Sequence, residues 1–184
     1  LKEFDQYTTT HSLNVSVLTM ALAEWMGMSA TDVRAFGVAG LLHDLGKVRI
    51  PKEVLTKPGK LTDEEWTIMR KHPVDGAKII YESDRNLDLA AAVAYEHHIM
   101  VNGEGYPRRQ FQRGVHSASK LVHVCDVYDA LRTNRPYRPA WDSEKVLSHI
   151  EKGAGPDFDL ESATAFITMM RNWEPRLAVV DDQT

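Results

Sequence analysis

The stretch LLHDLGKVRIP at residues 41–51 constrains the fold and chemistry of this chain more than any other. It ends an apolar helical run with two adjacent polar residues, His43 and Asp44, and places Lys47 just after a glycine. A buried polar group raises the free energy of the folded state unless it finds a partner. The stretch is therefore either a helix end with solvated charges or a pair of side chains that holds a ligand.

Apolar residues recur at helical spacing along most of the chain, and strand-like alternation never extends beyond a few residues. Ser29 with Asp32, and Thr62 with Glu65, are typical of capping boxes at helix starts. Pro73 marks a helix boundary or a new first turn. The pattern predicts an all-α fold, a single compact domain over residues 1–184 with about seven helices, in residues 11–26, 32–44, 62–72, 88–98, 117–133, 143–153 and 159–170.

Composition excludes several classes of protein. A formal net charge of −4 gives no basic bias, which argues against duplex nucleic acid as a partner. The single Cys125 rules out an intramolecular disulfide and fits a reducing compartment, so we expect a cytoplasmic protein. No apolar run reaches the roughly 18 residues of a membrane span, and no signal peptide is visible. The chain begins without Met, so we expect a domain excised from a longer protein with regulatory domains upstream.

Five of the eight histidines occupy positions where a predicted helix packs or ends. Any one of them alone is typical of a hydrogen-bonded structural histidine. Their joint placement with Asp44 and Asp126, which also sit in apolar surroundings, favours a metal centre in the core that satisfies all of them together. The five are His11, His43, His72, His97 and His98, whereas we interpret His116, His123 and His149 as structural or surface residues, with His123 as a candidate to support a ligand.

Two metals fit this pattern better than one. Adjacent residues on a helix point about 100° apart, so a single metal is hard to reach for both members of His43–Asp44 or of His97–His98. An aspartate bridging two metals removes this difficulty. Mixed imidazole and carboxylate ligands suit iron, manganese or zinc and argue against a thiolate site. Paired metals are typical of phosphate ester hydrolysis.

Three motifs follow one another along the chain: HDLGK at 43–47, HHIMVNGEGYP at 97–107 and DVYDALRTNRPYR at 126–138. Together they resemble the HD-GYP family of the HD phosphohydrolase superfamily, to which the segment between residues 50 and 80 is also similar. The resemblance extends from about His11 to residue 170. It implies an all-helical bacterial domain that hydrolyses cyclic dinucleotides, chiefly cyclic di-GMP, with two or three non-haem metals, usually iron or manganese.

The resemblance also implies roles for individual residues. Asp44 bridges the metals and holds a hydroxide between them, which attacks phosphorus. Lys47 places an ammonium against the non-bridging phosphate oxygens, although by itself it reads as a helix-end cation. The metal ligands implied are His11, His43, Asp44, His72, His97, His98 and Asp126.

The same family implies where the substrate lies. Tyr106 and Pro107 approach it, with Tyr106 stacking on the nucleotide or hydrogen-bonding to it. Arg135 and Arg138 resemble the family's phosphate- and guanine-facing cations, a task for which a planar fork of donors is suited. Without the resemblance, NGEGYP is only a glycine-containing turn and the two arginines are ordinary surface residues.

This chain departs from the family pattern at three positions. Some members carry a Glu four residues before the first ligand histidine, where this chain has Tyr7, so we expect two metals and not three. The family pattern is HHExxDGxGYP, and this chain has Ile99 in place of its Glu and Asn102 in place of its Asp. The departure bears on metal affinity, rate and substrate preference, because Ile99 cannot accept a hydrogen bond; Glu96 or Glu104 could orient an imidazole instead.

The sequence therefore predicts a metal-dependent phosphodiesterase that converts cyclic di-GMP to linear pGpG, to GMP or to both. Two alternatives stay open: an enzyme that prefers 3′,3′-cGAMP, and a weakly active module that binds cyclic dinucleotides or partner domains. We expect two divalent ions, iron or manganese, for which zinc, nickel or magnesium can substitute in a crystal. A homodimer is compatible with such a signalling domain, but the sequence contains no heptad repeat long enough to predict one.

Overall fold

The structure is a computed structural model that describes residues 2–108, 113–134 and 138–181, with backbone alone in residues 2–7 and 174–181. Within these ranges the regular structure is helical, and pairing of extended chain is limited to two isolated bridges, Ile99 with Gly105 and Ala154 with Phe158. The predicted all-α fold is confirmed. The α-helices are α1 (Lys2–Trp25), α2 (Ala30–Leu42), α3 (Lys52–Leu55), α4 (Asp63–Met69), α5 (His72–Ser83), α6 (Asp88–Glu96), α7 (Ser117–Arg132), α8 (Ser143–Gly153) and α9 (Leu160–Asp181), and the 3₁₀ helices are η1 (Leu45–Arg49) and η2 (Arg85–Leu87).

Both predicted caps are present. The Ser29 hydroxyl accepts a hydrogen bond from the Asp32 N–H at the start of α2. Thr62 and Glu65 form a complete capping box at the start of α4, in which each side chain accepts from the other's backbone N–H. These bonds satisfy N–H groups that have no partner within the helix and so fix where the two helices begin.

Helix α5 was not among the helices predicted from the sequence. Helix α4 ends at Met69, and a new helix begins at His72 with Pro73 in its first turn. Proline is tolerated there because a first-turn N–H has no helical partner in any case. The sequence indicated the boundary but not the helix, because only His72, Pro73, Gly76 and Ile80 of α5 are buried.

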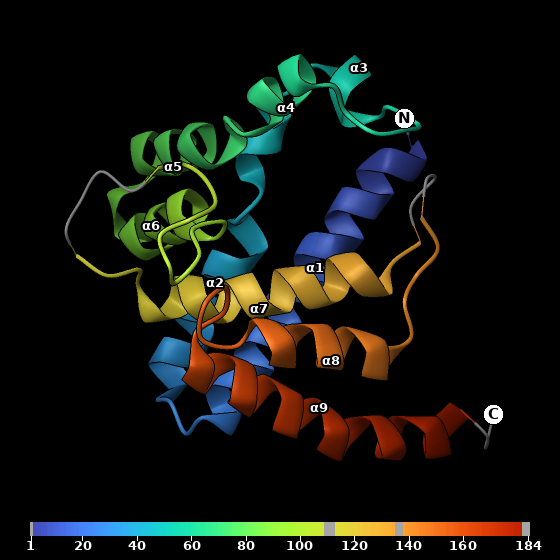
Figure 1. Cartoon of the computed structure of the whole chain (residues 1–184). Helices are drawn as coiled ribbons and strands as arrows, with labels where there is room; N and C mark the ends of the chain where they lie inside the picture. Colours follow the sequence, from blue (N-terminus) through green and yellow to red (C-terminus); the bar gives the residue numbers. More distant parts are fainter. Residues whose placement is uncertain (1, 109–112, 135–137, 182–184) are drawn as a thin grey trace.

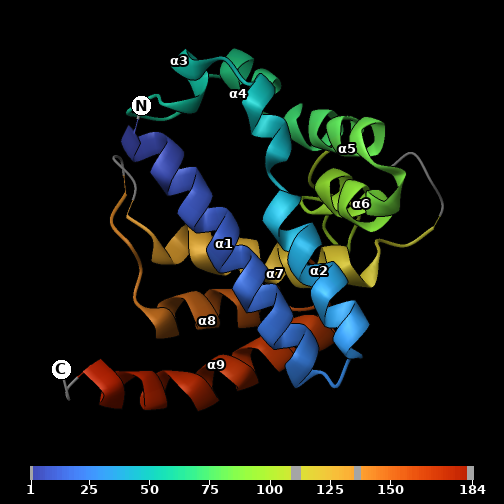
Figure 2. The same ribbon diagram turned by 180° about the vertical axis from the view of Figure 1, so that it is seen from behind.

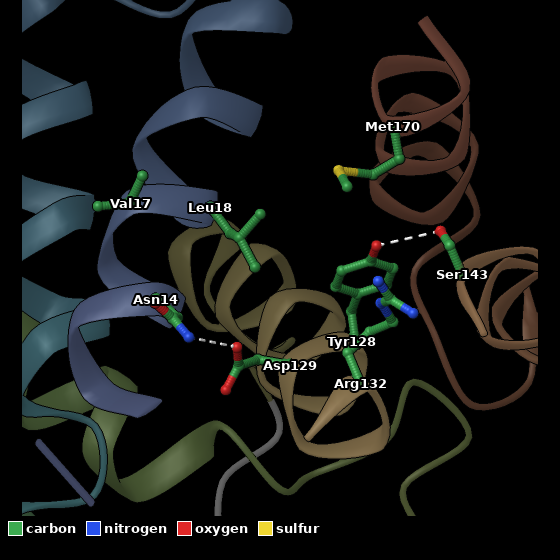
Figure 3. A pocket seen from close by; sticks show the side chains of 8 residues that line it. All are labelled: Asn14, Val17, Leu18, Tyr128, Asp129, Arg132, Ser143 and Met170. Carbon is green, nitrogen blue, oxygen red and sulfur yellow. Dashed lines mark hydrogen bonds between the residues drawn. The ribbon is translucent and has the colours of Figure 1, made fainter. Parts of the chain in front are cut away.

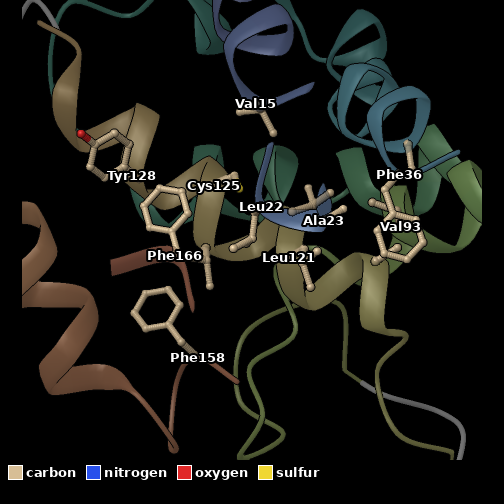
Figure 4. Close-up of a cluster of buried hydrophobic side chains, with 14 of the residues drawn as sticks. Val15, Leu22, Ala23, Phe36, Val93, Leu121, Cys125, Tyr128, Phe158 and Phe166 are labelled. Carbon is tan, nitrogen blue, oxygen red and sulfur yellow. The ribbon is translucent and has the colours of Figure 1, made fainter. Parts of the chain in front are cut away.

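Helix α7 passes through the middle of the molecule and contacts α1, α2, α6, α8 and α9 (Figures 1 and 2). Its buried face meets side chains from α1 and α9, among them Leu22 and Phe166 (Figure 4). The ring of Tyr128 packs edge-on against Phe166, with centroids 5.0 Å apart. Fully burying one large apolar side chain contributes about 1.5–3 kcal/mol, so this cluster fixes α7 firmly relative to α1.

Two glycines bring chain segments unusually close. A Cβ atom at Gly46 would lie 1.9 Å from the carbonyl oxygen of His72, so η1 packs backbone to backbone against the start of α5. Gly105 has a φ of +85°, and a Cβ there would lie 2.0 Å from the carbonyl oxygen of His98. The first approach joins the HDLGK segment to His72, and the second folds the GYP loop onto His98.

Among the described residues, we find no helix with the combination of length and apolarity that crossing a membrane requires.

Candidate metal centre

The seven predicted metal ligands converge on one point in the core. Four come from helix ends: His43 caps the C-terminus of α2, Asp44 precedes η1, His72 begins α5 and His97 caps the C-terminus of α6. His11 on α1 and Asp126 on α7 come from helix interiors, and His98 follows His97. Six of the seven are buried, and His98 is partly exposed.

The ligand atoms form two groups, and within each group they lie within 4.8 Å of one another. The carboxylate of Asp44 lies between the groups. Its Oδ1 is 3.4 Å from Nε2 of His72, and its Oδ2 is 3.5 Å from Nε2 of His43. One carboxylate oxygen thus faces each group, which is the arrangement that a bridging ligand needs. The first group is His11, His43 and Asp126, and the second is Asp44, His72, His97 and His98.

The expectation that two adjacent residues cannot reach the same metal does not hold for His97 and His98, which fall into one group. His43 and Asp44 fall into different groups, although Oδ2 of Asp44 also faces the group of His43. The rings of His97 and His98 have centroids only 4.1 Å apart. The 100° offset holds within a helix, but α6 ends at Glu96 and the two histidines lie in the turn that follows.

Backbone carbonyl groups hold three of the imidazole rings. Nδ1 of His43 lies 2.6 Å from the Gly40 carbonyl oxygen. The corresponding distance from His72 to Met69 is 2.8 Å, and from His97 to Ala94 it is 2.9 Å. A carbonyl can only accept, so each Nδ1 carries the proton and each Nε2 presents its lone pair. All three carbonyls lie three residues earlier, where a helix end leaves them without helical partners.

His11 has a different anchor, which the sequence did not reveal. Its Nδ1 lies 2.6 Å from Oδ2 of Asp129, and Nδ2 of Asn14 donates to Oδ1 of the same carboxylate at 2.8 Å. A carboxylate behind a ligand imidazole fixes the ring and raises its basicity. The available signal was that Asp129 lies one turn after Asp126 on the same face of its helix. His123 also supports the site, because its Nδ1 contacts the carbonyl oxygen of His97 at 2.7 Å.

Burial and charge set the protonation of the site. Burial dominates for His72 and His98 and lowers their pKa values to about 4 and about 3. For His11 burial acts in the same direction, but Asp126 and Asp129 outweigh it and raise its pKa to about 9. Burial opposes ionisation of Asp44, yet Lys47 and the imidazoles hold its pKa well below the usual range. Near neutral pH the second group is therefore deprotonated and ready to bind a cation.

Two atoms at the centre of the site require a ligand. Nε2 of His43 and Oδ1 of Asp44 are buried and form no hydrogen bond within the described part of the chain. Leaving a buried polar group unsatisfied costs about 1–3 kcal/mol. Both atoms present lone pairs, and together with the other imidazoles and Asp126 they form a nitrogen and oxygen donor set. The residues present therefore fit divalent metal ions.

A cavity of about 640 Å³ opens onto this centre. One end is lined by five of the seven predicted metal ligands and by Lys47, whose ammonium contacts Oδ2 of Asp44. The five are His11, Asp44, His72, His98 and Asp126. The other end is lined by α3, by the segment that joins α3 to α4 and by α4 itself, which Figures 1 and 2 show above the N-terminal half of α1. These distal residues are Val54, Leu55, Lys57, Gly59, Lys60, Leu61, Trp66 and Met69.

The GYP loop places Tyr106 in the cavity wall. The Tyr106 ring lies against the ring of His98, with centroids 4.6 Å apart. The backbone N–H of Tyr106 donates a hydrogen bond to the His98 carbonyl oxygen. Burial raises the pKa of Tyr106 above its ordinary value, so its hydroxyl stays protonated and can donate a hydrogen bond. Pro107 is partly buried beside it.

The structure describes one of the two predicted arginines. Arg135 lies outside the described residues. The guanidinium of Arg138 donates to the carbonyl oxygens of Ala130 and Leu131 at 2.7 and 3.3 Å, and it lies 5.7 Å from the ring centroid of Trp141. It thus caps the end of α7 in this structure, and its role toward substrate stays a prediction.

The departures from the family pattern have local explanations. Ile99 is buried and pairs with Gly105, and the Asn102 side chain accepts from the Glu104 N–H at 2.8 Å. Glu96 is buried and accepts from Ser119 Oγ at 2.8 Å and from the backbone N–H of His116. Its carboxylate is therefore directed away from the ligand imidazoles. The side chain of Tyr7 lies outside the described residues.

A second cavity, of about 590 Å³, lies between α1, α7 and the C-terminal helices (Figure 3). Asp129 and Asn14 both line it, so the carboxylate that anchors His11 also borders a space away from the metal ligands. The remaining lining residues are Val17, Leu18, Tyr128, Arg132, Ser143 and Met170.

Comparison with known proteins identifies the family. A family model described as the HD domain matches residues 3–161. The chain belongs to the HD domain family. This HD domain is 38% identical over 167 residues to a cyclic di-GMP phosphodiesterase of Pseudomonas aeruginosa, which covers 91% of this chain and 40% of that protein. The resemblance to the HD-GYP family is thus confirmed.

Two further comparisons extend this result. The HD domain is 31% identical over 173 residues to a 3′3′-cGAMP-specific phosphodiesterase of Vibrio cholerae, covering 94% of this chain and 33% of that protein. A solved HDG"Y"P protein from Bdellovibrio bacteriovorus shares the fold, with a TM-score of 0.70 at 19% identity over 89% of this chain and 52% of that one. The HD domain thus spans 40% and 33% of the length of the two curated phosphodiesterases, which is less than half of each.

Proposed function

We propose that this HD domain hydrolyses a phosphodiester bond of a bacterial cyclic dinucleotide, with cyclic di-GMP as the favoured substrate and pGpG, GMP or both as products. The observation that carries the proposal is the Asp44 carboxylate, which lies between two groups of inward-facing ligand atoms at the floor of a cavity. The relative named as a cyclic di-GMP phosphodiesterase supports the substrate class.

His11, His43 and Asp126 would hold one divalent metal, and His72, His97 and His98 would hold the other, with Asp44 as a ligand of both. Two such ions supply a water-derived nucleophile at neutral pH and a clamp for phosphate oxygens. Iron or manganese suits this donor set because it contains imidazole and carboxylate groups and no thiolate.

The side chains around the centre complete the reaction site. Lys47 lines the cavity and contacts Asp44, so its ammonium is placed to meet a non-bridging oxygen of a phosphate bound at the metal ligands. Tyr106 donates a hydrogen bond from its protonated hydroxyl. The anchors behind His11, His43, His72 and His97 keep the ring nitrogens aimed inward while substrate enters and product leaves.

Hydrolysis of cyclic di-GMP by the purified, manganese- or iron-loaded protein, followed by anion-exchange chromatography, tests the proposal. We expect time-dependent appearance of pGpG or GMP in the parent and none in the Asp44→Asn variant. Parallel kinetics on 3′,3′-cGAMP address the alternative substrate, which the Vibrio cholerae relative's name motivates. Binding of cyclic di-GMP without any product would overturn hydrolysis and favour a binding module, the alternative that Ile99 and Asn102 motivated.

A further inference from the structure

An exposed tryptophan stands at the mouth of the metal-centre cavity. Trp66 lies on α4, its side chain is 40% exposed, and it lines the same cavity as His72 and Asp126. A large apolar ring left open to solvent at the edge of a binding cavity is typical of a contact surface for a ligand.

Arg70 braces this ring. Its guanidinium carbon lies 5.7 Å from the ring centroid of Trp66 and 5.8 Å from that of Tyr106. These distances place the cation within range of attraction to both rings and so tie α4 to the GYP loop. Arg70 is not among the residues that line the cavity, so the indole surface that borders the cavity is left open to a ligand.

Tyr106 is less suited to stacking on a substrate base. Its ring already lies against His98 and close to Arg70, which leaves the hydroxyl as its part toward substrate. Apart from Tyr106 and the histidines, Trp66 is the aromatic residue among the described lining residues. Of the two roles considered for Tyr106, the geometry favours hydrogen bonding, and Trp66 offers the free ring surface.

We propose that Trp66 is the stacking platform for one purine base of the cyclic dinucleotide, with Arg70 as a positioning residue that holds its ring. The inference rests on the proposed function and names the site of one base. Every purine presents a flat face that stacks on indole. With the scissile phosphate at the metal ligands, a base of the same molecule extends along the cavity toward α4. Lys60 adds positive charge there for the second phosphate, whereas Lys57 is paired with Glu65.

Steady-state kinetics on cyclic di-GMP test the platform. We expect Trp66→Ala to raise KM about tenfold or more, with kcat within about twofold of the parent, because loss of a base–aromatic stack weakens binding by that order. Trp66→Phe should restore most of the affinity. Trp25→Ala is the matched control, since Trp25 on α1 is 41% exposed and lies outside the cavity. Arg70→Ala should raise KM by a smaller factor, and Arg70→Lys should restore part of it.

A binding measurement separates stacking from damage to the metal centre. Tryptophan fluorescence should be quenched when the parent binds a phosphorothioate analogue of cyclic di-GMP that resists hydrolysis, and the quenching should be largely lost in Trp66→Phe. The metal content of Trp66→Ala, measured by elemental analysis, should match that of the parent. A loss of metal in this variant, or an unchanged KM for cyclic di-GMP in an active protein, would overturn the platform. A parent that neither binds nor hydrolyses any cyclic dinucleotide would instead overturn the proposed function.

Discussion

At the scale of single residues, His11 is the metal-ligand candidate with the most elaborate support. A carboxylate holds its ring, and that carboxylate is held in turn by Asn14. His43, His72 and His97 depend on backbone carbonyls only. Side-chain substitutions can therefore disturb the orientation of His11 without touching the ring itself.

Replacing Asp129 with alanine should weaken metal binding at the group of His11, His43 and Asp126. Loss of the partner behind a ligand imidazole typically lowers metal affinity by about 10- to 100-fold. Metal titration of the chelator-treated protein measures the effect. Asn14→Ala is the control, since it leaves the contact between His11 and Asp129 in place, and we expect a smaller change. Equal affinities in the parent and Asp129→Ala would contradict the anchoring role.

Replacing Asp44 with alanine should remove most of both metals, because one of its oxygens faces each group. Elemental analysis of the purified protein should fall from close to two ions per chain to well under one. Lys47→Ala is the comparison, since it removes a charge beside the same carboxylate and leaves every ligand in place. A variant without Asp44 that kept its full metal content would rule out bridging.

The residue scale also shows what could be predicted from the sequence. The seven ligand candidates were recognisable because histidines and aspartates in apolar helical stripes need partners, and the structure brings all seven together. Asp129 was missed because its partner His11 lies 118 residues away in the chain. The engagement of Arg138 with the end of α7 was missed for a different reason. Its partners Leu131 and Ala130 are near in the sequence, but a sequence pattern does not show whether a side chain beyond a helix end turns back to cap it.

At the scale of elements, the metal centre is assembled from helix ends. The C-terminus of α2, the start of α5 and the C-terminus of α6 meet there, and η1 packs directly on α5 at Gly46. Helix α5 could not be recognised from its short apolar face, although its first residue, His72, was identified as a ligand candidate. The polar residue His72 was thus easier to recognise in the sequence than helix α5, which carries it.

Replacing Gly46 with alanine should separate η1 from α5. The added Cβ would meet the His72 carbonyl oxygen at 1.9 Å and the Gly76 nitrogen at 2.5 Å. Overpacking of this kind costs about 1–3 kcal/mol, and here it also moves Asp44 relative to His72. We expect a lower melting temperature and a reduced metal content. Gly114→Ala is the matched control, because a Cβ there meets nothing within 4 Å. If both variants melted like the parent, the close approach would not be a constraint.

At the scale of the whole molecule, the core around α7 must tolerate a dense group of ionisable side chains. His11 contacts Asp126 on the inner side of the helix that also carries Tyr128 of the apolar cluster. The stability of the metal-free protein should therefore depend strongly on pH, because several of these groups titrate at different pH values in the folded and unfolded chain.

We expect the metal-free protein to be most stable near pH 6.5. His72 has a folded pKa of about 4, so between pH 6.5 and 4 the unfolded chain binds more protons and stability falls as the pH falls. This one residue accounts for about 3 kcal/mol over that window. His11 has a folded pKa of about 9, so its contribution is present below pH 6.5 and is lost as the pH rises through 9.

Urea denaturation of the chelator-treated protein from pH 4 to pH 9 measures this profile. A flat profile would show that the histidines titrate as they do in the unfolded chain. Saturating manganese should raise stability throughout, since a ligand that binds only the folded state stabilises it.

The assignment of residues 1–184 to one domain and the homodimer stay predictions.

The backbone anchors of the imidazoles have a consequence for mutational tolerance. The carbonyl groups of Met69 and Ala94 exist whichever side chains stand at those positions, so substitutions there leave the hydrogen bonds to His72 and His97 chemically intact. The orientations of His72 and His97 are thus little affected by substitutions at the residues that anchor them. The orientation of His11 is more sensitive, because its anchor is one side chain, Asp129. Random mutagenesis should therefore find loss-of-metal variants more often among the neighbours of His11 than among those of His72.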